Sequence, residues 1–75
     1  MTTTAKQIGA ILREKRKAKN LTQKEMAKIA YNDELQQSLI SRIEGGNYKS
    51  VGFEDITIIL SGLGIDLIEL IEKTN

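Results

Sequence analysis

The 75-residue chain contains neither cysteine nor histidine. Without cysteine it cannot form disulfide bonds, and without both residue types the usual zinc ligand sets cannot be built. Thiol nucleophiles and catalytic triads with a histidine base are excluded in their common forms. There is no GxxxxGK[ST] phosphate loop, and the acid pairs Asp33-Glu34 and Glu54-Asp55 are typical of helix starts. We therefore predict a protein that is not an enzyme and requires neither a metal ion nor a cofactor.

Long apolar runs are absent as well. No segment approaches the roughly 18 consecutive apolar residues that indicate a membrane-spanning helix. The start, Met1-Thr2-Thr3-Thr4, lacks the charged and apolar segments of a signal peptide. We therefore expect a cytoplasmic protein with no membrane contact. The length predicts one domain over residues 1–75, near the lower limit at which a core alone sustains folding.

The net charge of +1 conceals a gradient along the chain. Residues 1–30 hold eight Lys/Arg and two acids, giving +6, and residues 31–50 hold two bases and three acids, giving −1. Residues 51–75 hold one base and five acids, giving −4. A basic front and an acidic back are typical of a protein that presents one face to a polyanion. The alternative is that a lysine-rich amphipathic helix simply has a solvated face.

Residues 21–47, LTQKEMAKIAYNDELQQSLISRIEGGN, predict two short helices joined by a tight connection. The first is expected from about Gln23 to Ala30, because Thr22 and Glu25 have the spacing of a capping box. The second is expected from about Gln36 to Glu44. Apolar residues recur at helical spacing in both: Met26, Ala27, Ile29 and Ala30, and then Leu35, Leu39, Ile40 and Ile43.

The polar residues of the second helix are unusual for a plain solvated face. They gather near its start and along one side: Gln36, Gln37, Ser38, Ser41 and Arg42. Amides, hydroxyls and a guanidinium hydrogen-bond to base edges and phosphates, whereas a solvated helix more often alternates Glu and Lys. Taken alone, this face fits a nucleic-acid contact and an ordinary solvent-exposed surface equally well.

A longer helix is predicted before this stretch and a loop after it. The helix should run from Thr4 or Ala5 to Lys19, with an apolar stripe that Leu21 closes. Asn20 tolerates the positive φ that commonly ends a helix. After the second short helix, residues 45–52 (GGNYKSVG) form the predicted loop, since two glycines allow positive φ and close backbone approach.

The C-terminal part predicts two further helices, within residues 53–73. The first should run from Phe53 to Ser61 or Gly62; its β-branched residues would suit a strand, but a lone strand has no partner in this chain. Asp66 and Glu69 repeat the capping-box spacing and predict a helix from Leu67 to about Lys73. Its apolar residues exceed what one small core hides, and we expect some of them to form a homodimer interface: Leu67, Ile68, Leu70 and Ile71. The alternative is that all of them close the core of the monomer.

LTQKEMAKIA followed by QSLISRIEGG resembles the helix-turn-helix of the lambdoid phage repressor and Cro family, the xenobiotic-response-element-type proteins. The resemblance covers residues 8–70. It implies an all-α, compact five-helix, lambda-repressor-like domain that binds double-stranded DNA as a homodimer, with its helix-turn-helix at about residues 22–44. The second short helix would then lie in the major groove with its N-terminal residues against base edges.

The resemblance also gives individual residues their roles. Gln37 and Ser38 are the first choices for base contact, Arg42 would read guanine or clamp a phosphate, and Gln36 and Ser41 come second. Backbone contacts are expected from Gln23, which begins a helix and can direct its amide at a phosphate, and from the loop residues Asn47, Lys49 and Ser50. By the same resemblance, Arg16 should pair with Glu44 and so tie the first helix to the reading helix.

One segment departs from the family pattern. The family's turn between the two short helices is short and contains a glycine, whereas AYNDELQQ is about three residues longer and has none. The insertion can lengthen the first helix or the turn, or give the second helix an earlier start capped by Asp33. We expect a longer turn with Leu35 buried.

These observations predict a transcriptional regulator, specifically a repressor that binds an inverted-repeat operator as a homodimer. Phage, plasmid, restriction-modification and toxin–antitoxin systems all use such a domain. The alternative is a protein-interaction module, such as a toxin-neutralising antitoxin whose acidic, isoleucine-rich C-terminal helices bind a partner protein.

Overall fold

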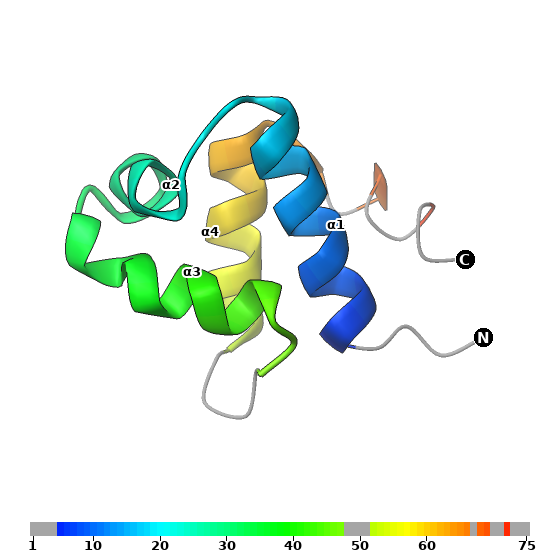
Figure 1. The fold of residues 1–75 in the computed structure, drawn as a ribbon. Helices are drawn as coiled ribbons and strands as arrows, with labels where there is room; N and C mark the ends of the chain where they lie inside the picture. Colours follow the sequence, from blue (N-terminus) through cyan, green and yellow to red (C-terminus); the bar gives the residue numbers. More distant parts are fainter. Residues whose placement is uncertain (1–4, 48–51, 67, 70–71, 73–75) are drawn as a thin grey trace.

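The computed structural model describes residues 5–47, 52–66, 68–69 and 72, and helices joined by turns and loops make up this part of the chain (Figure 1). Its elements in chain order are α1 (Ala5–Ala18), α2 (Gln23–Tyr31), the 3-10 turn η1 (Glu34–Gln36), α3 (Gln37–Glu44) and α4 (Phe53–Leu63). Figure 1 shows α1 beside α4, with α2 and α3 joined at the opposite side of the molecule. The all-α prediction is confirmed for these residues.

Every α-helix contributes to one apolar core. The buried apolar side chains are Leu12, Met26, Ala27, Ile40, Ile43, Ile56, Ile59, Leu60, Leu63 and Ile65. Ile8, Ile11, Leu21 and Leu39 are partly buried and pack against this cluster, as the helical spacing predicts. Ile29 departs from the pattern, because it is half exposed.

The helix ends lie within two residues of the predicted ones where the structure describes them. Asn20 adopts a left-handed conformation with φ 57°, and the Leu21 amide donates to the Arg16 carbonyl beyond the end of α1. Gly64 ends α4 in the same way with φ 72°. These positions suit Asn and Gly because other side chains are strained at positive φ.

A glycine allows α1 and α3 to touch through their backbones. A Cβ atom placed on Gly9 would lie 2.3 Å from the carbonyl oxygen of Ile43 and 2.8 Å from that of Glu44. The C-terminal turn of α3 therefore rests directly on α1. Gly46, with φ 80°, ends this turn close to the backbone of Lys6.

The end of α2 is joined to the start of α4. The Tyr31 hydroxyl donates to Asp55 Oδ1 at 2.7 Å, while Asp55 Oδ2 accepts from the Gly52 amide at 3.3 Å. Burial raises the pKa of the Tyr31 hydroxyl above its usual value, and the hydrogen bond to Asp55 raises it further. Tyr31, at the last residue of α2, thus packs against the core and anchors the turn that follows.

The expectation that Leu35 is buried is wrong. Asn32 ends α2 at φ 55°, and Asp33 Oδ1 accepts from the Leu35 amide at 3.0 Å, which starts η1 directly before α3. Leu35 is 86% exposed. The α-helical spacing that would place Leu35 above Leu39 fails here, because a 3-10 turn has three residues per turn. The expected longer turn is present, because residues 32–36 separate α2 from α3, and Asp33 caps the 3-10 turn η1 within it.

The five-helix count is not confirmed, since the described residues contain four α-helices. Asp66 Oδ1 accepts from the Glu69 amide at 2.9 Å, as expected at a helix start. Residues 67, 70–71 and 73–75, which hold most of the predicted fifth helix, lie outside the described residues. In the part of the chain that is described, no helix is long and apolar enough to cross a bilayer.

Candidate nucleic-acid interface

The start of α2 is built by the predicted capping box. Thr22 Oγ1 accepts from the Glu25 amide at 3.0 Å, and Glu25 Oε1 accepts from the Thr22 amide at 2.9 Å. Hydrogen bonds from Thr22 lower the pKa of the Glu25 carboxyl, and the bond from the backbone amide has a larger effect than the bond from the hydroxyl. These contacts fix where α2 begins and hence where Gln23, its first residue, is held.

The polar residues of α3 lie on the side of the helix away from the core. Ile40 and Ile43 are buried, whereas Gln37, Ser38, Ser41 and Arg42 are exposed. The spacings 37/41 and 38/42 place these four side chains on one face. Gln36, the last residue of η1, is intermediate in exposure.

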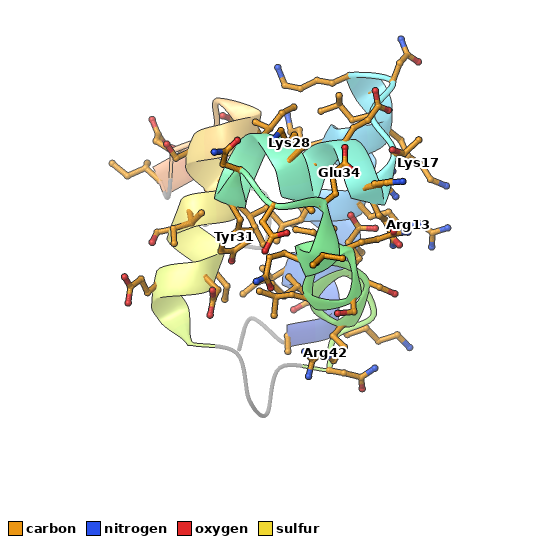
Figure 2. The ribbon with its side chains drawn as sticks, turned by 90° about the vertical axis from the view of Figure 1, so that its left-hand side faces the viewer. Arg13, Lys17, Lys28, Tyr31, Glu34 and Arg42 are labelled. Atoms are coloured by element: carbon orange, nitrogen blue, oxygen red, sulfur yellow. The ribbon has the colours of Figure 1, made fainter. Side chains whose placement is uncertain are left out.

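An open depression of about 600 Å³ lies between the start of α2 and this face of α3. Its lining residues are Gln23, Lys24, Glu34, Leu35, Gln37, Ser38 and Ser41. Four of the side chains predicted to contact DNA thus border one concave surface. Gln36 and Arg42 do not line the depression. Figure 2 shows Arg42 near the bottom of the molecule.

A hydrogen-bonded network adjoins the depression through Gln23. Arg16 Nε donates to Glu44 Oε2 at 2.6 Å, and Arg16 Nη2 donates to Glu44 Oε1 at 3.0 Å. Arg16 Nη1 also donates to the Leu21 carbonyl at 2.6 Å, just before α2. Gln23 Nε2 donates to Glu44 Oε1 at 3.2 Å, so that the proposed phosphate contact shares an acceptor with Arg16. The network joins α1, the start of α2 and the end of α3.

The predicted loop contacts are only partly placed. Asn47 is exposed, and its backbone amide donates to the Arg42 carbonyl at 2.9 Å just beyond the end of α3. Lys49 and Ser50 lie outside the described residues. Of the predicted dimer residues, Ile68 is 67% exposed, whereas Leu67, Leu70 and Ile71 lie outside the described residues.

Basic residues of α1 form a second depression, whose position beside α3 the sequence alone did not give. Its lining residues are Lys6, Ala10, Arg13, Glu14 and Lys17 of α1, with Glu44 and Gly45 at the end of α3. In Figure 2, Arg13 and Lys17 extend from the right-hand side of the molecule. The spacing of Lys6, Arg13 and Lys17 by seven and four residues, which places all three on one face of a helix, was the available signal. That this face adjoins α3 follows only from the packing.

An ion pair across the first depression was also missed. Lys24 Nζ lies 3.8 Å from Glu34 Oε2, and both side chains are largely exposed. The pair connects α2 to η1 and neutralises the acidic charge beside the polar face of α3. No cluster of acidic side chains suited to a metal ion occurs in the described ranges.

Two consecutive helices, the second with a polar outward face and held by its end to α1, define a helix-turn-helix protein. A family model described as Helix-turn-helix matches residues 12–70 of the chain. Because the match covers most of the sequence, the chain belongs to this family, the Cro/C1-type helix-turn-helix proteins, which are DNA-binding transcription regulators.

No curated protein and no solved structure is significantly similar to the chain.

Proposed function

We propose that the protein is a sequence-specific repressor that binds an inverted-repeat operator as a homodimer. The observation that carries the proposal is the outward face of α3, where Gln37, Ser38, Ser41 and Arg42 are all exposed. The amide, two hydroxyls and guanidinium on this outward face of α3 match the hydrogen-bonding edges of bases in a major groove. Gln37 and Ser38, in the first turn of α3, are the primary reading residues.

Phosphate contacts flank this face in the proposed complex. Gln23 begins α2, whose N-terminal amides and dipole favour an anion. Its side-chain amide already donates to Glu44, so a phosphate oxygen would be its second partner or would replace Glu44. Arg13 and Lys17, in the basic depression of α1, supply cations beside the end of α3. Asn47, Lys49 and Ser50 are proposed to contact the backbone from the following loop.

The homodimer is proposed from the apolar C-terminal sequence. Ile68 is an exposed large apolar side chain, and Leu67, Leu70 and Ile71 surround it in the chain. Two copies related by a two-fold axis would place two α3 helices in successive major grooves, about 34 Å or 10 bp apart. A bound operator would exclude other proteins from that stretch of DNA, which is how the protein would repress. Since its ligand is DNA, we expect it to act in the cytoplasm.

Selection from a random duplex library tests this function. The wild-type protein should enrich an inverted repeat, whereas Gln37→Ala and Arg42→Ala should lose or alter the preference at defined positions. Each good base contact discriminates against a wrong base by about 1–3 kcal/mol. Lys28→Ala is the matched control for Arg42→Ala, because it removes one exposed positive charge from α2, and it should enrich the same repeat. Absence of any enriched sequence for the folded wild-type protein would contradict the proposal.

The second candidate is a protein-interaction module such as an antitoxin. The exposed Ile68 within a segment of charge −4 (residues 51–75) favours it, because an apolar side chain in an acidic segment suits a basic protein partner. Ile68→Asp would then abolish partner binding and spare DNA binding, while Arg42→Ala would do the reverse. If the repressor proposal holds, Ile68→Asp should instead shift the protein from dimer to monomer in sedimentation experiments.

A further inference from the structure

Leu35 is a large apolar side chain left in solvent at the start of the reading element. It is 86% exposed, while its backbone amide is fixed by Asp33 Oδ1 at 3.0 Å. Single exposed leucines are common on protein surfaces and need no explanation by themselves. Leu35 differs from the other exposed large apolar residues, Ile29 and Ile68, because it lines the depression that Gln37 and Ser38 share.

The surroundings of Leu35 can accept a polyanion despite the two acidic residues before it, Asp33 and Glu34. Glu34 lies 3.8 Å from Lys24 Nζ, so its charge is compensated by an ion pair across the depression. Gln23, the proposed phosphate contact, lines the same depression. DNA that approaches Gln37 and Ser38 would therefore come to Leu35 with Glu34 paired to Lys24 and with the Asp33 carboxylate engaged by the Leu35 amide.

Major grooves offer one apolar group to such a side chain. Thymine presents a C5 methyl group there, whereas the other recognition groups on base edges are hydrogen-bond donors and acceptors. A leucine among amides and hydroxyls cannot satisfy any of those polar groups, but it can cover a methyl group and remove it from water.

We infer that Leu35 is a specificity-determining residue that packs on the C5 methyl group of a thymine, next to the base pair that Gln37 reads. This inference rests on the proposed DNA-binding function and names one base that the operator must contain. Because η1 turns Leu35 outward, the inserted residues before α3 extend the reading surface by one apolar contact. Gln37 and Ser38 supply hydrogen bonds, and Leu35 supplies shape and apolar area.

The experiment replaces each thymine of the selected operator, one at a time, by uracil, which lacks only the C5 methyl group. Affinities of the full chain are measured at one fixed salt concentration. For the wild-type protein, one thymine per half-site should show an affinity loss of about three- to fourfold, as expected for one buried methyl group. Leu35→Ala should show no loss at that position and an unchanged profile at the others. Ile29→Ala, which removes a half-exposed apolar side chain outside the depression, should retain the wild-type profile.

The outcomes separate this inference from the function on which it rests. Identical uracil profiles for the wild-type protein and Leu35→Ala, with a defined operator, would overturn the thymine contact alone. A Leu35→Ala variant that changes the oligomeric state and keeps the wild-type uracil profile would assign Leu35 to a protein contact and overturn the inference as well. If the folded wild-type protein selects no operator, both the proposed function and this inference fail. Leu35→Ala is expected to fold normally, because the side chain contributes little to the core.

Discussion

Arg16 on α1 and Glu44 on α3 form a bidentate ion pair that is almost fully removed from solvent. The two N–O distances are 2.6 and 3.0 Å, and the side chains are only 8% and 5% exposed. Arg16 also donates to the Leu21 carbonyl, and Gln23 donates to Glu44. The pair therefore fixes the reading helix relative to α1 and to the start of α2. Desolvation offsets much of its attraction, so its contribution lies in orientation more than in net stability.

Breaking this pair from one side should be costly. Glu44→Ala leaves the Arg16 guanidinium buried without its counter-charge, and we expect the free energy of unfolding to fall by about 3–5 kcal/mol. Urea denaturation followed by circular dichroism measures the change. The double variant Arg16→Met/Glu44→Leu is the control, since replacing both charges by apolar groups should cost much less. A loss below about 0.5 kcal/mol for Glu44→Ala would mean that the pair behaves like a surface ion pair.

The close approach of α1 and α3 at Gly9 predicts a strong effect of one methyl group. In Gly9→Ala the new Cβ would meet the Ile43 carbonyl oxygen at 2.3 Å, and neither backbone can yield without moving a helix. We expect a destabilisation of about 2–3 kcal/mol, which exceeds the roughly 1 kcal/mol that alanine gains in a helix.

Gly62→Ala is the matched control for Gly9→Ala. Its Cβ would meet Met26 Cε at 2.9 Å, the far end of a flexible side chain that can rotate away. Thermal unfolding of both variants should therefore separate them, with Gly62→Ala close to the wild-type midpoint. Equal midpoints for the two variants would contradict the backbone contact.

The basic depression of α1 should be visible in the salt dependence of DNA binding. If Arg13 and Lys17 each neutralise one phosphate, the slope of log Kobs against log salt becomes shallower by about 0.9 for each residue changed to glutamine, in each protomer. Lys28→Gln, on α2, removes the same charge and should leave the slope unchanged. A wild-type slope for the Arg13→Gln/Lys17→Gln variant would show that these two residues of α1 do not contact DNA phosphates.

Tyr31 should make stability depend on pH in the alkaline range. An unfolded tyrosine ionises near pH 10, whereas burial and the contact with Asp55 raise the pKa of folded Tyr31. Above about pH 10 the unfolded state therefore binds fewer protons than the folded state, and the free energy of unfolding falls as the pH rises. Tyr31→Phe should reduce this fall.

The comparison is made by urea denaturation near pH 8 and again near pH 11. Near pH 8, Tyr31→Phe should cost about 1 kcal/mol, the net value of one hydrogen bond. Tyr48→Phe controls for the other tyrosine of the chain. Alkaline slopes that are the same for Tyr31→Phe and the wild-type protein would show that Tyr31 does not cause the effect.

Local signals account for most of the fold. The capping box of Thr22 and Glu25 and the positive φ of Asn20 depend on neighbours within a few residues, and both were predictable. The helix that begins at Phe53 was predicted for a different reason, because a lone strand would have no partner. The outward face of α3 followed from its periodicity as well. The Arg16–Glu44 contact joins residues 28 apart; it was expected from the family resemblance, because spacing in the chain carries no information on such a pair.

The sequence by itself determined four of the five predicted helices and the chemistry of one polar face, because hydrogen bonding and side-chain spacing within a turn decide these features. The tertiary structure decided that Leu35 faces solvent, that Gly9 meets α3 and that Arg13 and Lys17 adjoin its end. The exposure of Leu35 depends on the 3-10 geometry of η1, and the other two depend on how whole helices pack. The direction of a side chain after an inserted turn, and the closeness of two backbones, are fixed only once the shared core has closed.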